Sequence, residues 1–398
     1  MKTYQLLKSH CSKIFFSGTG NYWYEGNAIG NDKSLFYRLY AIILISTYAF
    51  MTVLEIMAAL IGDFPNDEKS DSVTFAVSHT IVMIKIFSVI LNKNLIKSLN
   101  KSIATVCETY ENPMLMAEKY RIIKINILAY VLVVYGAVAG FVFEGLRKLF
   151  SGSHFVTIVT YYPSYEDNSS LATSFRVFTT IVLSVMMVTM IVSVDSFTMM
   201  YLIIFKYKVI TLRHYFDGLR EEFDRNNKSD AKGASEKLSK GLIEGIIMHS
   251  ELLRILKDID TAFGTVMAMQ LCQSSGSAVS LLLQIALSKD LTFIVGMKII
   301  LFVVALFFLL ALFLCNAGEI TYQASLLSDA IFYCGWHACP SQKPPQRKLG
   351  SIVLIACVQA QRPVVMKAFR MIDLTYATFL SVVRMTYSVF ALFYAQNK

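Results

Sequence analysis

Three residues near the carboxyl end have side chains of the kind that bind metal ions. Cys334, His337 and Cys339 lie in the segment CGWHAC, and thiolates and imidazoles are the usual ligands of zinc. Their spacing matches no standard zinc pattern and no fourth ligand accompanies them, so we expect no metal site. The sequence also lacks a phosphate-binding glycine loop, an HExxH motif and a GxSxG motif, which argues against an enzyme and against a bound cofactor.

Charged residues inside long apolar runs form the second chemically notable group. Lys85, Lys298 and Arg384 have apolar neighbours in the sequence, and Glu55 and Asp195 are the acids in similar surroundings. An arginine at the centre of a bilayer costs on the order of 3 kcal/mol, so Arg384 should face water, an acid or the protein interior. Snorkelling to the membrane surface is the alternative. Lys298 is expected either to snorkel in the same way or to point its ammonium at a ligand carbonyl.

The composition places these charges in a membrane protein. Of the 398 residues, 55% are hydrophobic and 16% are charged, and the mean hydropathy is +0.52, which is too apolar for a soluble domain of this size. Seven runs are long enough to cross about 30 Å of hydrocarbon. The fold class predicted is therefore all-α with seven transmembrane helices, and the excess length of several runs predicts tilted helices that project into the cytoplasm. The predicted spans are 35–61, 72–91, 122–144, 172–205, 262–287, 291–315 and 375–396.

The distribution of basic residues predicts the orientation. Most lysines and arginines lie before the first span and in the second, fourth and sixth loops, which are cytoplasmic by the positive-inside rule. The amino terminus is then cytoplasmic and the carboxyl terminus extracellular. Asn168 begins a glycosylation sequon in an outer loop, whereas the sequons at Asn100 and Asn227 fall inside and should be unmodified. The net charge of +9 fits cytoplasmic loops against anionic lipid, so no nucleic acid partner is expected.

The sixth loop has the strongest internal pattern. Ile320, Ala324, Leu327, Ile331 and Cys334 repeat at a spacing of four and three, which predicts a helix with one apolar seam. A second seam follows after a Pro-rich break and runs into the last span. These cytoplasmic helices either lie on the membrane or form an assembly core between subunits. The chain thereby divides into a cytoplasmic segment at 1–34, a six-helix bundle at 35–315, cytoplasmic anchor helices at 316–374 and the last transmembrane helix at 375–398.

At its carboxyl end the sequence resembles the insect odorant receptors. The match upstream is confined to topology, length and loop charge. The residues that carry the resemblance are Cys315, Gly318, Glu319, Ser325, Ser328, Ala330, Tyr333, Trp336, Arg347, Gln361, Arg362, Pro363, Lys367, Ala368, Phe379 and Tyr387 to Phe390.

Two departures refine the resemblance. The related gustatory receptors have Gln-Phe at the positions of Phe393 and Tyr394, which favours the odorant branch. The odorant co-receptor has an insertion in its second cytoplasmic loop, and the segment 206–260 of this chain has no such excess. The sequence therefore resembles an odour-tuning subunit and not the co-receptor.

The resemblance implies a function and partners. It implies an odorant-gated, non-selective cation channel subunit that forms a heterotetramer with the co-receptor in the plasma membrane of olfactory sensory neurons. The last helix would line the pore, either through a polar stripe that includes Arg384, Ser388 and Ala391, or through a gate at Phe390 and Tyr394 with Ser388 and Ala391 beside it. We favour the gate pair. A G-protein-coupled chemosensory receptor is the alternative, but the predicted topology and the absence of DRY and NPxxY motifs argue against it.

The resemblance also implies where a small volatile organic ligand binds. In the family this site is an apolar cavity in the outer half of the bundle among spans two, three, four and six, and for each residue ordinary helix packing is the competing role. His79 either tunes a pH response or is a satisfied histidine within the membrane. The candidates are Phe75, His79, Tyr135, Ala139, Thr180, Leu183, Met187, Met297, Leu301, Phe302, Ala305 and Phe308.

Overall fold

Helices make up nearly all of the regular structure. The computed structural model describes residues 2–26, 28–62, 66–150, 170–287, 293–339 and 347–396, so Asn168 lies outside the described residues. The helices are α1 Thr3–Phe16, α2 Leu35–Ile61, α3 Asn66–Leu91, α4 Lys93–Thr105, α5 Pro113–Phe150, α6 Ser170–Asn226, α7 Ala231–Leu287, α8 Phe293–Ser325, α9 Leu327–Phe332, α10 Arg347–Ala360 and α11 Tyr376–Gln396. Short 3₁₀ turns cover η1 Glu108–Tyr110 and η2 Trp336–Ala338, and β1 Lys367–Ala368 pairs antiparallel with β2 Ile372–Asp373.

Seven of the described helices are long and apolar enough to cross a membrane, which confirms the predicted number. They are α2, α3, α5, α6, α7, α8 and α11. The start of α2 is set by Ser34, whose side chain accepts a hydrogen bond from the backbone N–H of Tyr37 at 3.3 Å. This N-cap satisfies one of the amide groups that a helix leaves unpaired at its beginning. Long, mainly apolar sequence then continues each of these helices across the bundle.

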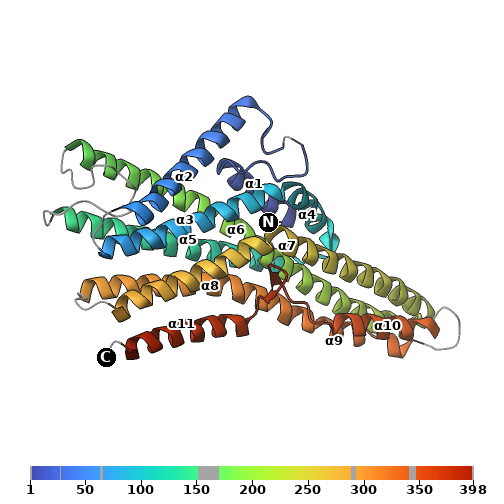
Figure 1. Cartoon of the computed structure of the whole chain (residues 1–398). Coiled ribbons are helices and arrows are strands. Elements are labelled where there is room, and N and C mark those ends of the chain that lie inside the picture. Colours follow the sequence, from blue (N-terminus) through green and yellow to red (C-terminus); the bar gives the residue numbers. More distant parts are fainter. Residues whose placement is uncertain are drawn as a thin grey trace.

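Two helices extend far beyond the membrane-crossing part of the bundle. α6 and α7 each have 57 residues, so each is about 85 Å long at the rise of an α-helix. Figure 1 shows the pair running together away from the bundle as an antiparallel hairpin. This confirms the prediction that the long fourth apolar run is one projecting helix and not two spans.

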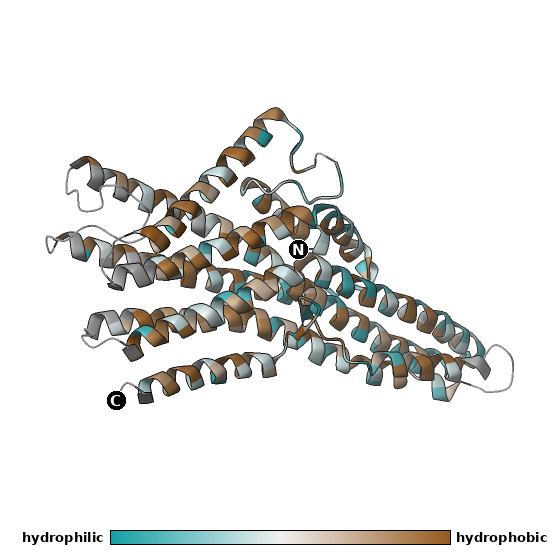
Figure 2. Ribbon diagram, viewed as in Figure 1, coloured by the Kyte–Doolittle hydropathy of each residue, from teal (hydrophilic) through white to brown (hydrophobic). Residues whose placement is uncertain are grey.

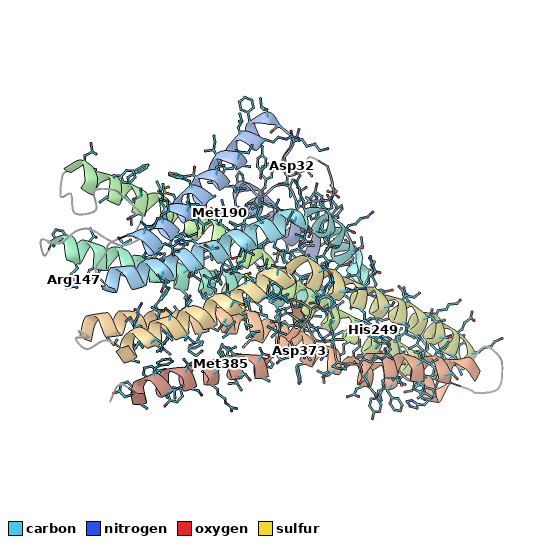
Figure 3. The ribbon with its side chains drawn as sticks, in the orientation of Figure 1. Asp32, Arg147, Met190, His249, Asp373 and Met385 are labelled. Atoms are coloured by element: carbon cyan, nitrogen blue, oxygen red, sulfur yellow. The ribbon has the colours of Figure 1, made fainter. Side chains whose placement is uncertain are left out.

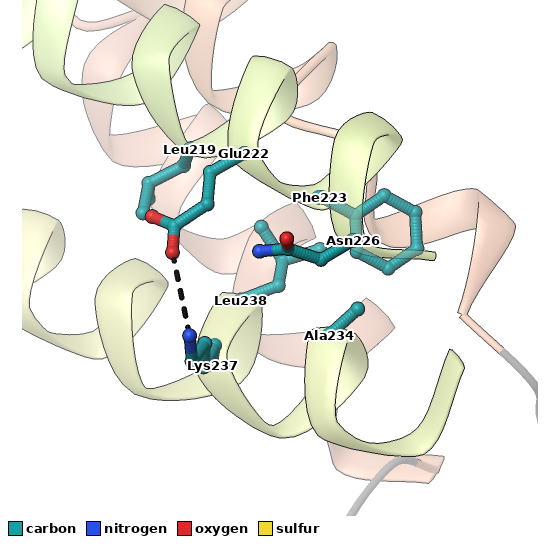
Figure 4. A pocket seen from close by; sticks show the side chains of 7 residues that line it. All are labelled: Leu219, Glu222, Phe223, Asn226, Ala234, Lys237 and Leu238. Carbon is teal, nitrogen blue, oxygen red and sulfur yellow. Dashed lines mark ion pairs between the residues drawn. The ribbon is translucent and has the colours of Figure 1, made fainter. Parts of the chain in front are cut away.

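The far end of this hairpin closes on a small apolar cluster. Phe223 packs with Ala234 and Leu238, and Lys237 lies 3.7 Å from Glu222 across the two helices (Figure 4). The hollow between them measures about 10 Å³, which is room for about one water molecule. It is therefore a packing defect of the hairpin and not a site for an organic ligand.

The seam predicted in the sixth loop is buried. Ile320, Ala324, Leu327, Ile331 and Cys334 are all at most 5% exposed. α8 carries the first part of the seam beyond the bundle, and α9 continues it after a break at Leu326. The second seam forms α10, which packs on α9 and buries Leu349, Val353, Ala356 and Ala360.

The amino-terminal segment is folded against the middle of the molecule. Leu7 and Cys11 of α1 and Tyr22 after it are fully buried. The side-chain amide of Asn100 on α4 donates to the Tyr22 carbonyl at 2.8 Å, and its oxygen accepts from the Tyr201 hydroxyl at 2.6 Å. Both ends of this buried amide are used, so the folded chain offers no acceptor for a glycan at Asn100.

A buried cluster of charged side chains joins α1, α5 and α6 in the same part of the molecule. The carboxylate of Glu111 lies 3.2 Å from the ammonium of Lys119 on α5 and 2.8 Å from that of Lys208 on α6. It also accepts from the Thr3 hydroxyl at the start of α1. Burial alone would raise the pKa of Glu111, but the two lysines lower it below its usual value.

The outside of the bundle is apolar. Figure 2 shows that hydrophobic residues predominate along the membrane-crossing helices and that hydrophilic ones are more frequent along the projecting hairpin, and many of the large hydrophobic side chains of the bundle are exposed. Figure 3 contrasts two methionines: Met190 on α6 is fully buried within the bundle, whereas Met385 on α11 is 58% exposed. An apolar surface of this extent is expected where lipid or other subunits cover it.

Candidate functional site

A cavity of about 80 Å³ lies among the membrane-crossing helices α3, α5, α6, α7 and α8. It is several times larger than the hollow in the α6–α7 hairpin. Most of its lining is aliphatic or aromatic, which suits a small organic molecule that offers dispersion contacts. The lining residues are Phe75, Ser78, Tyr130, Val133, Val134, Ala137, Val138, Ile191, Gln270, Gln273, Phe302, Ala305, Leu306 and Leu309.

Helical periodicity explains why these residues meet. Phe302, Ala305, Leu306 and Leu309 lie on one face of α8, because residues three, four and seven positions apart share a face of a helix. On α3, the ring of Phe75 stacks on that of His79 with 5.9 Å between their centroids. This contact fixes one aromatic wall of the cavity.

A polar network forms one side of the cavity. The ammonium of Lys85 on α3 lies 3.1 Å from a carboxylate oxygen of Asp195 on α6, and both side chains are almost completely buried. The same ammonium donates to the side-chain carbonyl oxygens of Gln270 and, at 3.3 Å, Gln273 on α7. The hydroxyl of Tyr130 on α5 donates to Asp195. Four helices around the cavity are therefore joined through one ion pair, which neutralises both charges where water is scarce.

A second buried pair of polar side chains lies at the aromatic wall formed by Phe75 and His79. Nδ1 of His79 is hydrogen bonded to Glu55 on α2, and both side chains are fully buried. The two embedded acids are thus paired with Lys85 and His79 and not with Arg384. Arg384 is exposed on α11, and among the described residues no acid pairs with it.

The cavity brings together three of the predicted ligand-binding residues, Phe75, Phe302 and Ala305. His79 and Thr180 are buried outside its lining. Five others lie on the outer surface of the single chain: Tyr135, Ala139, Met297, Leu301 and Phe308. Leu183 and Met187 lie on α6, and their side chains, like that of Lys298, are outside the described part of the structure.

Sequence reasoning missed the polar side of the cavity. Tyr130, Gln270 and Gln273 were not among the predicted residues, and the fifth span was not among the helices expected to line the site. One signal for them exists, since Gln270, Gln273 and Ser277 form a polar stripe at helical spacing in an otherwise apolar span. A lysine in span two also requires polar partners from its neighbours.

The last helix stands at the edge of the bundle. At its start the Tyr376 hydroxyl donates to Glu319 of α8 at 3.0 Å, and a Cβ at Gly318 would approach the Tyr376 ring to 2.9 Å. Beyond that point most side chains of α11 are exposed, including Ser388. The rings of Phe390 and Tyr394 stack with centroids 5.7 Å apart, one turn apart on the same face, while Ala391 is half-buried.

Comparison with known proteins places this arrangement in a family. The family model described as 7tm Odorant receptor matches residues 66–387. The chain belongs to the odorant receptor family. This confirms the predicted family and makes the protein a receptor with a multi-pass membrane fold, and the family is not one of enzymes.

Two solved structures of the insect olfactory receptor OR5 from Machilis hrabei are similar to this receptor. The structure in complex with eugenol has a TM-score of 0.75 at 13% identity and covers 98% of this chain and 97% of that chain. A second structure of OR5 has a TM-score of 0.77 at 13% identity, with 96% of each chain covered. At this identity the likeness shows that the receptor has the same fold. A comparison with curated proteins finds no match.

Proposed function

We propose that the receptor is the odour-tuning subunit of an odorant-gated, non-selective cation channel. It would assemble with the odorant co-receptor as a heterotetramer in the plasma membrane of olfactory sensory neurons. The observation that carries the proposal is the mainly apolar cavity lined by five helices of an odorant receptor fold. Such a cavity suits a volatile molecule, which offers much hydrophobic surface and few polar groups.

The exposed last helix supports a channel built from several chains. α11 contacts α7 and α8 along one side and leaves Leu380, Tyr387 and Leu392 more than half exposed. A helix at the edge of a bundle can border a shared conduit when other subunits cover it. Under the proposal Phe390 and Tyr394 form the gate, with Ser388 and Ala391 beside it and Arg384 nearer the cytoplasm.

The short link in the α6–α7 hairpin supports a tuning subunit. α6 ends at Asn226 and α7 begins at Ala231, so the described hairpin has no room for the insertion expected of a co-receptor. The orientation follows the basic residues, with the amino terminus and the projecting hairpin in the cytoplasm and the carboxyl terminus outside. The helices α9 and α10 would then serve as the cytoplasmic anchor between subunits.

Gating is expected to be a shift between closed and open populations. A ligand opens the channel only if it binds the open arrangement more tightly, and several kcal/mol of differential affinity are needed. α7 supplies a route for this coupling, because it carries Gln270 beside the cavity and Asp260 beside the hairpin that precedes α11.

The test is the whole-cell current evoked by an odorant panel, with and without the co-receptor, while G-protein signalling is blocked. Rapid current that requires the co-receptor supports the proposal. The variant Ala305→Phe, which fills the cavity, should abolish the response. Its matched control Val304→Phe, at a 58% exposed position on the outer face of α8, should keep it. Responses that need no co-receptor and disappear under the block would instead indicate a G-protein-coupled receptor.

A further inference from the structure

We infer that Gln273 provides the hydrogen-bond donor that selects ligands with a carbonyl or ester oxygen. The inference rests on the proposed odorant function of the cavity and adds the chemical class of the ligand. It assigns a specificity role to the fifth membrane-crossing helix, α7, through a side chain that lines the cavity and also touches the buried ion pair.

The orientation of the Gln273 amide is fixed by chemistry. A lysine ammonium has donors only, so the Gln273 atom 3.3 Å from the Lys85 nitrogen must be the carbonyl oxygen. The other branch of the amide is then the NH₂ group. This group has no hydrogen-bond partner among the described residues, and Gln273 is only half-buried because it borders the cavity.

The neighbouring polar side chains are already bonded within the network. Gln270 accepts from Lys85 with its oxygen and donates to the Ser274 hydroxyl at 3.2 Å with its nitrogen. The single hydroxyl proton of Tyr130 is donated to Asp195. Gln270 keeps one further N–H, but this residue is only 3% exposed. Gln273 is therefore the member of this network, within the described structure, whose NH₂ group has neither proton bonded and is the more accessible from the cavity.

The ion pair strengthens this donor. A positive charge on the carbonyl side of an amide polarises it and makes its N–H groups better donors, since hydrogen bonds in series reinforce one another. Ser78 is a second hydroxyl in the lining, but no charged group of the described network is bonded to it. We therefore assign the stronger selection to Gln273 and treat Ser78 as the competing donor.

The rest of the cavity defines the remainder of the ligand. Phe75, Phe302 and Leu306 provide apolar surface for an alkyl or aryl body. A ligand that reaches Gln273 with one oxygen and fills this surface uses both parts of the site. The inference therefore favours small ketones, aldehydes and esters over hydrocarbons of the same shape.

The experiment compares cyclohexanone with methylenecyclohexane, in which a methylene group replaces the oxygen. Binding is measured directly as ligand-induced thermal stabilisation of the full purified receptor, after correction for the different water solubility of the two compounds. The same pair is then tested by current with the co-receptor. The unaltered receptor should bind the ketone more tightly than the alkene.

Gln273→Met should weaken ketone binding by about fivefold, the worth of one net hydrogen bond, and leave alkene binding nearly unchanged. Ser275→Ala is the matched control, because Ser275 lies on the same helix, bonds to its own Leu271 carbonyl at 2.7 Å and is not part of the lining. It should alter neither affinity. Ser78→Ala should weaken ketone binding less than Gln273→Met does.

Several outcomes overturn the inference. They are an equal loss for both compounds in Gln273→Met, no preference for the ketone in the unaltered receptor, or selective loss in Ser78→Ala alone. The comparison of ketone with alkene in the unaltered receptor requires no variant. A variant that fails to fold therefore does not remove the test. Ketone-selective stabilisation without any current would contradict the channel function while upholding the role of Gln273.

Discussion

The carboxylate of Asp260 accepts a hydrogen bond from the backbone N–H of Lys367 at 3.3 Å. One helical turn further along α7, a Cβ at Gly264 would lie 3.3 Å from the carbonyl oxygen of Lys367. α7 therefore binds the N–H of Lys367 through Asp260 and makes room for its carbonyl oxygen at Gly264. The hairpin that begins there contains Phe369 and Arg370 with φ values of 51° and 61°, a conformation that non-glycine residues adopt at a cost.

This contact predicts that Asp260 protects the hairpin from proteolysis. Asp260→Ala removes the acceptor, so local opening should become more frequent and tryptic cleavage after the exposed Arg370 should accelerate by about fivefold, as expected for loss of one hydrogen bond. The rate is measured by the appearance of the carboxyl-terminal fragment. Asp258→Ala is the control, because Asp258 pairs with Arg254 at 3.9 Å and not with the hairpin. Equal rates in both variants would contradict the prediction.

The ion pair beside the cavity predicts a strong difference between single and double substitutions. Lys85→Met or Asp195→Leu leaves one buried charge without its partner and should lower the free energy of unfolding by roughly 3 to 5 kcal/mol. The double variant removes both charges and should recover much of this loss. The thermal midpoint of the purified receptor measures all three. Additive losses in the double variant would show that the pair is not coupled.

A buried histidine predicts a pH dependence. Burial within α1 lowers the pKa of His10 to about 4, so the unfolded chain binds the proton more readily than the folded one. The associated stability is complete above about pH 6.5 and is lost as the pH falls towards 4, by on the order of 2 to 3 kcal/mol at about pH 4.5.

His10→Leu should therefore flatten the fall of the thermal midpoint between about pH 7.5 and about pH 4.5. His337→Asn, at an exposed position, should retain the fall of the unaltered receptor. A variant at position 10 that follows the unaltered pH profile would exclude His10 as the cause.

The topology predicts one glycan. Asn168 should carry it in insect cells, and glycosidase treatment should shift the mobility of the receptor on a gel, because its sequon is expected outside the cell. Asn168→Gln should remove the shift. Asn227 lies at the tip of the α6–α7 hairpin, so a glycan there would place the hairpin outside and reverse the proposed orientation.

The stacked pair on α11 predicts a gate. Phe390→Ala removes one of the two rings and should increase the current without odorant severalfold in cells that also express the co-receptor, because a narrower hydrophobic constriction conducts less. Leu380→Ala, at an exposed position nearer the start of the helix, is the control for the loss of an apolar side chain. A basal current that is unchanged in Phe390→Ala would remove this residue from the gate.

Periodicity and composition predicted the parts of the fold that depend on a single helix. The number of spans, the projection of α6 as one helix and the buried seam from Ile320 to Cys334 all follow from patterns within one stretch of sequence, although α6 runs to Asn226 and so beyond the predicted end at 205. The structure also explains why residue 318 is a glycine, since the Tyr376 ring occupies the space that a side chain at Gly318 would fill.

The pairings between helices were not predictable in the same way. Glu55 and Asp195 were recognised as embedded acids and considered as partners of Arg384, but their partners are His79 and Lys85. Which charges meet depends on the rotation and depth of each helix in the bundle. A sequence read one segment at a time contains neither the rotation nor the depth. The polar stripe of Gln270, Gln273 and Ser277 is visible in it, but the cavity that the two glutamines border and the contribution of Tyr130 are not.

The Lys85–Asp195 pair also has a consequence for biosynthesis. The two residues are 110 positions apart, so α3 emerges from the ribosome with its lysine long before the acid exists. Until α6 arrives, a newly made chain has an ammonium inside a membrane helix with no counter-charge. Cellular quality control could recognise that unpaired charge, and only a chain in which α3 and α6 have come together would conceal it.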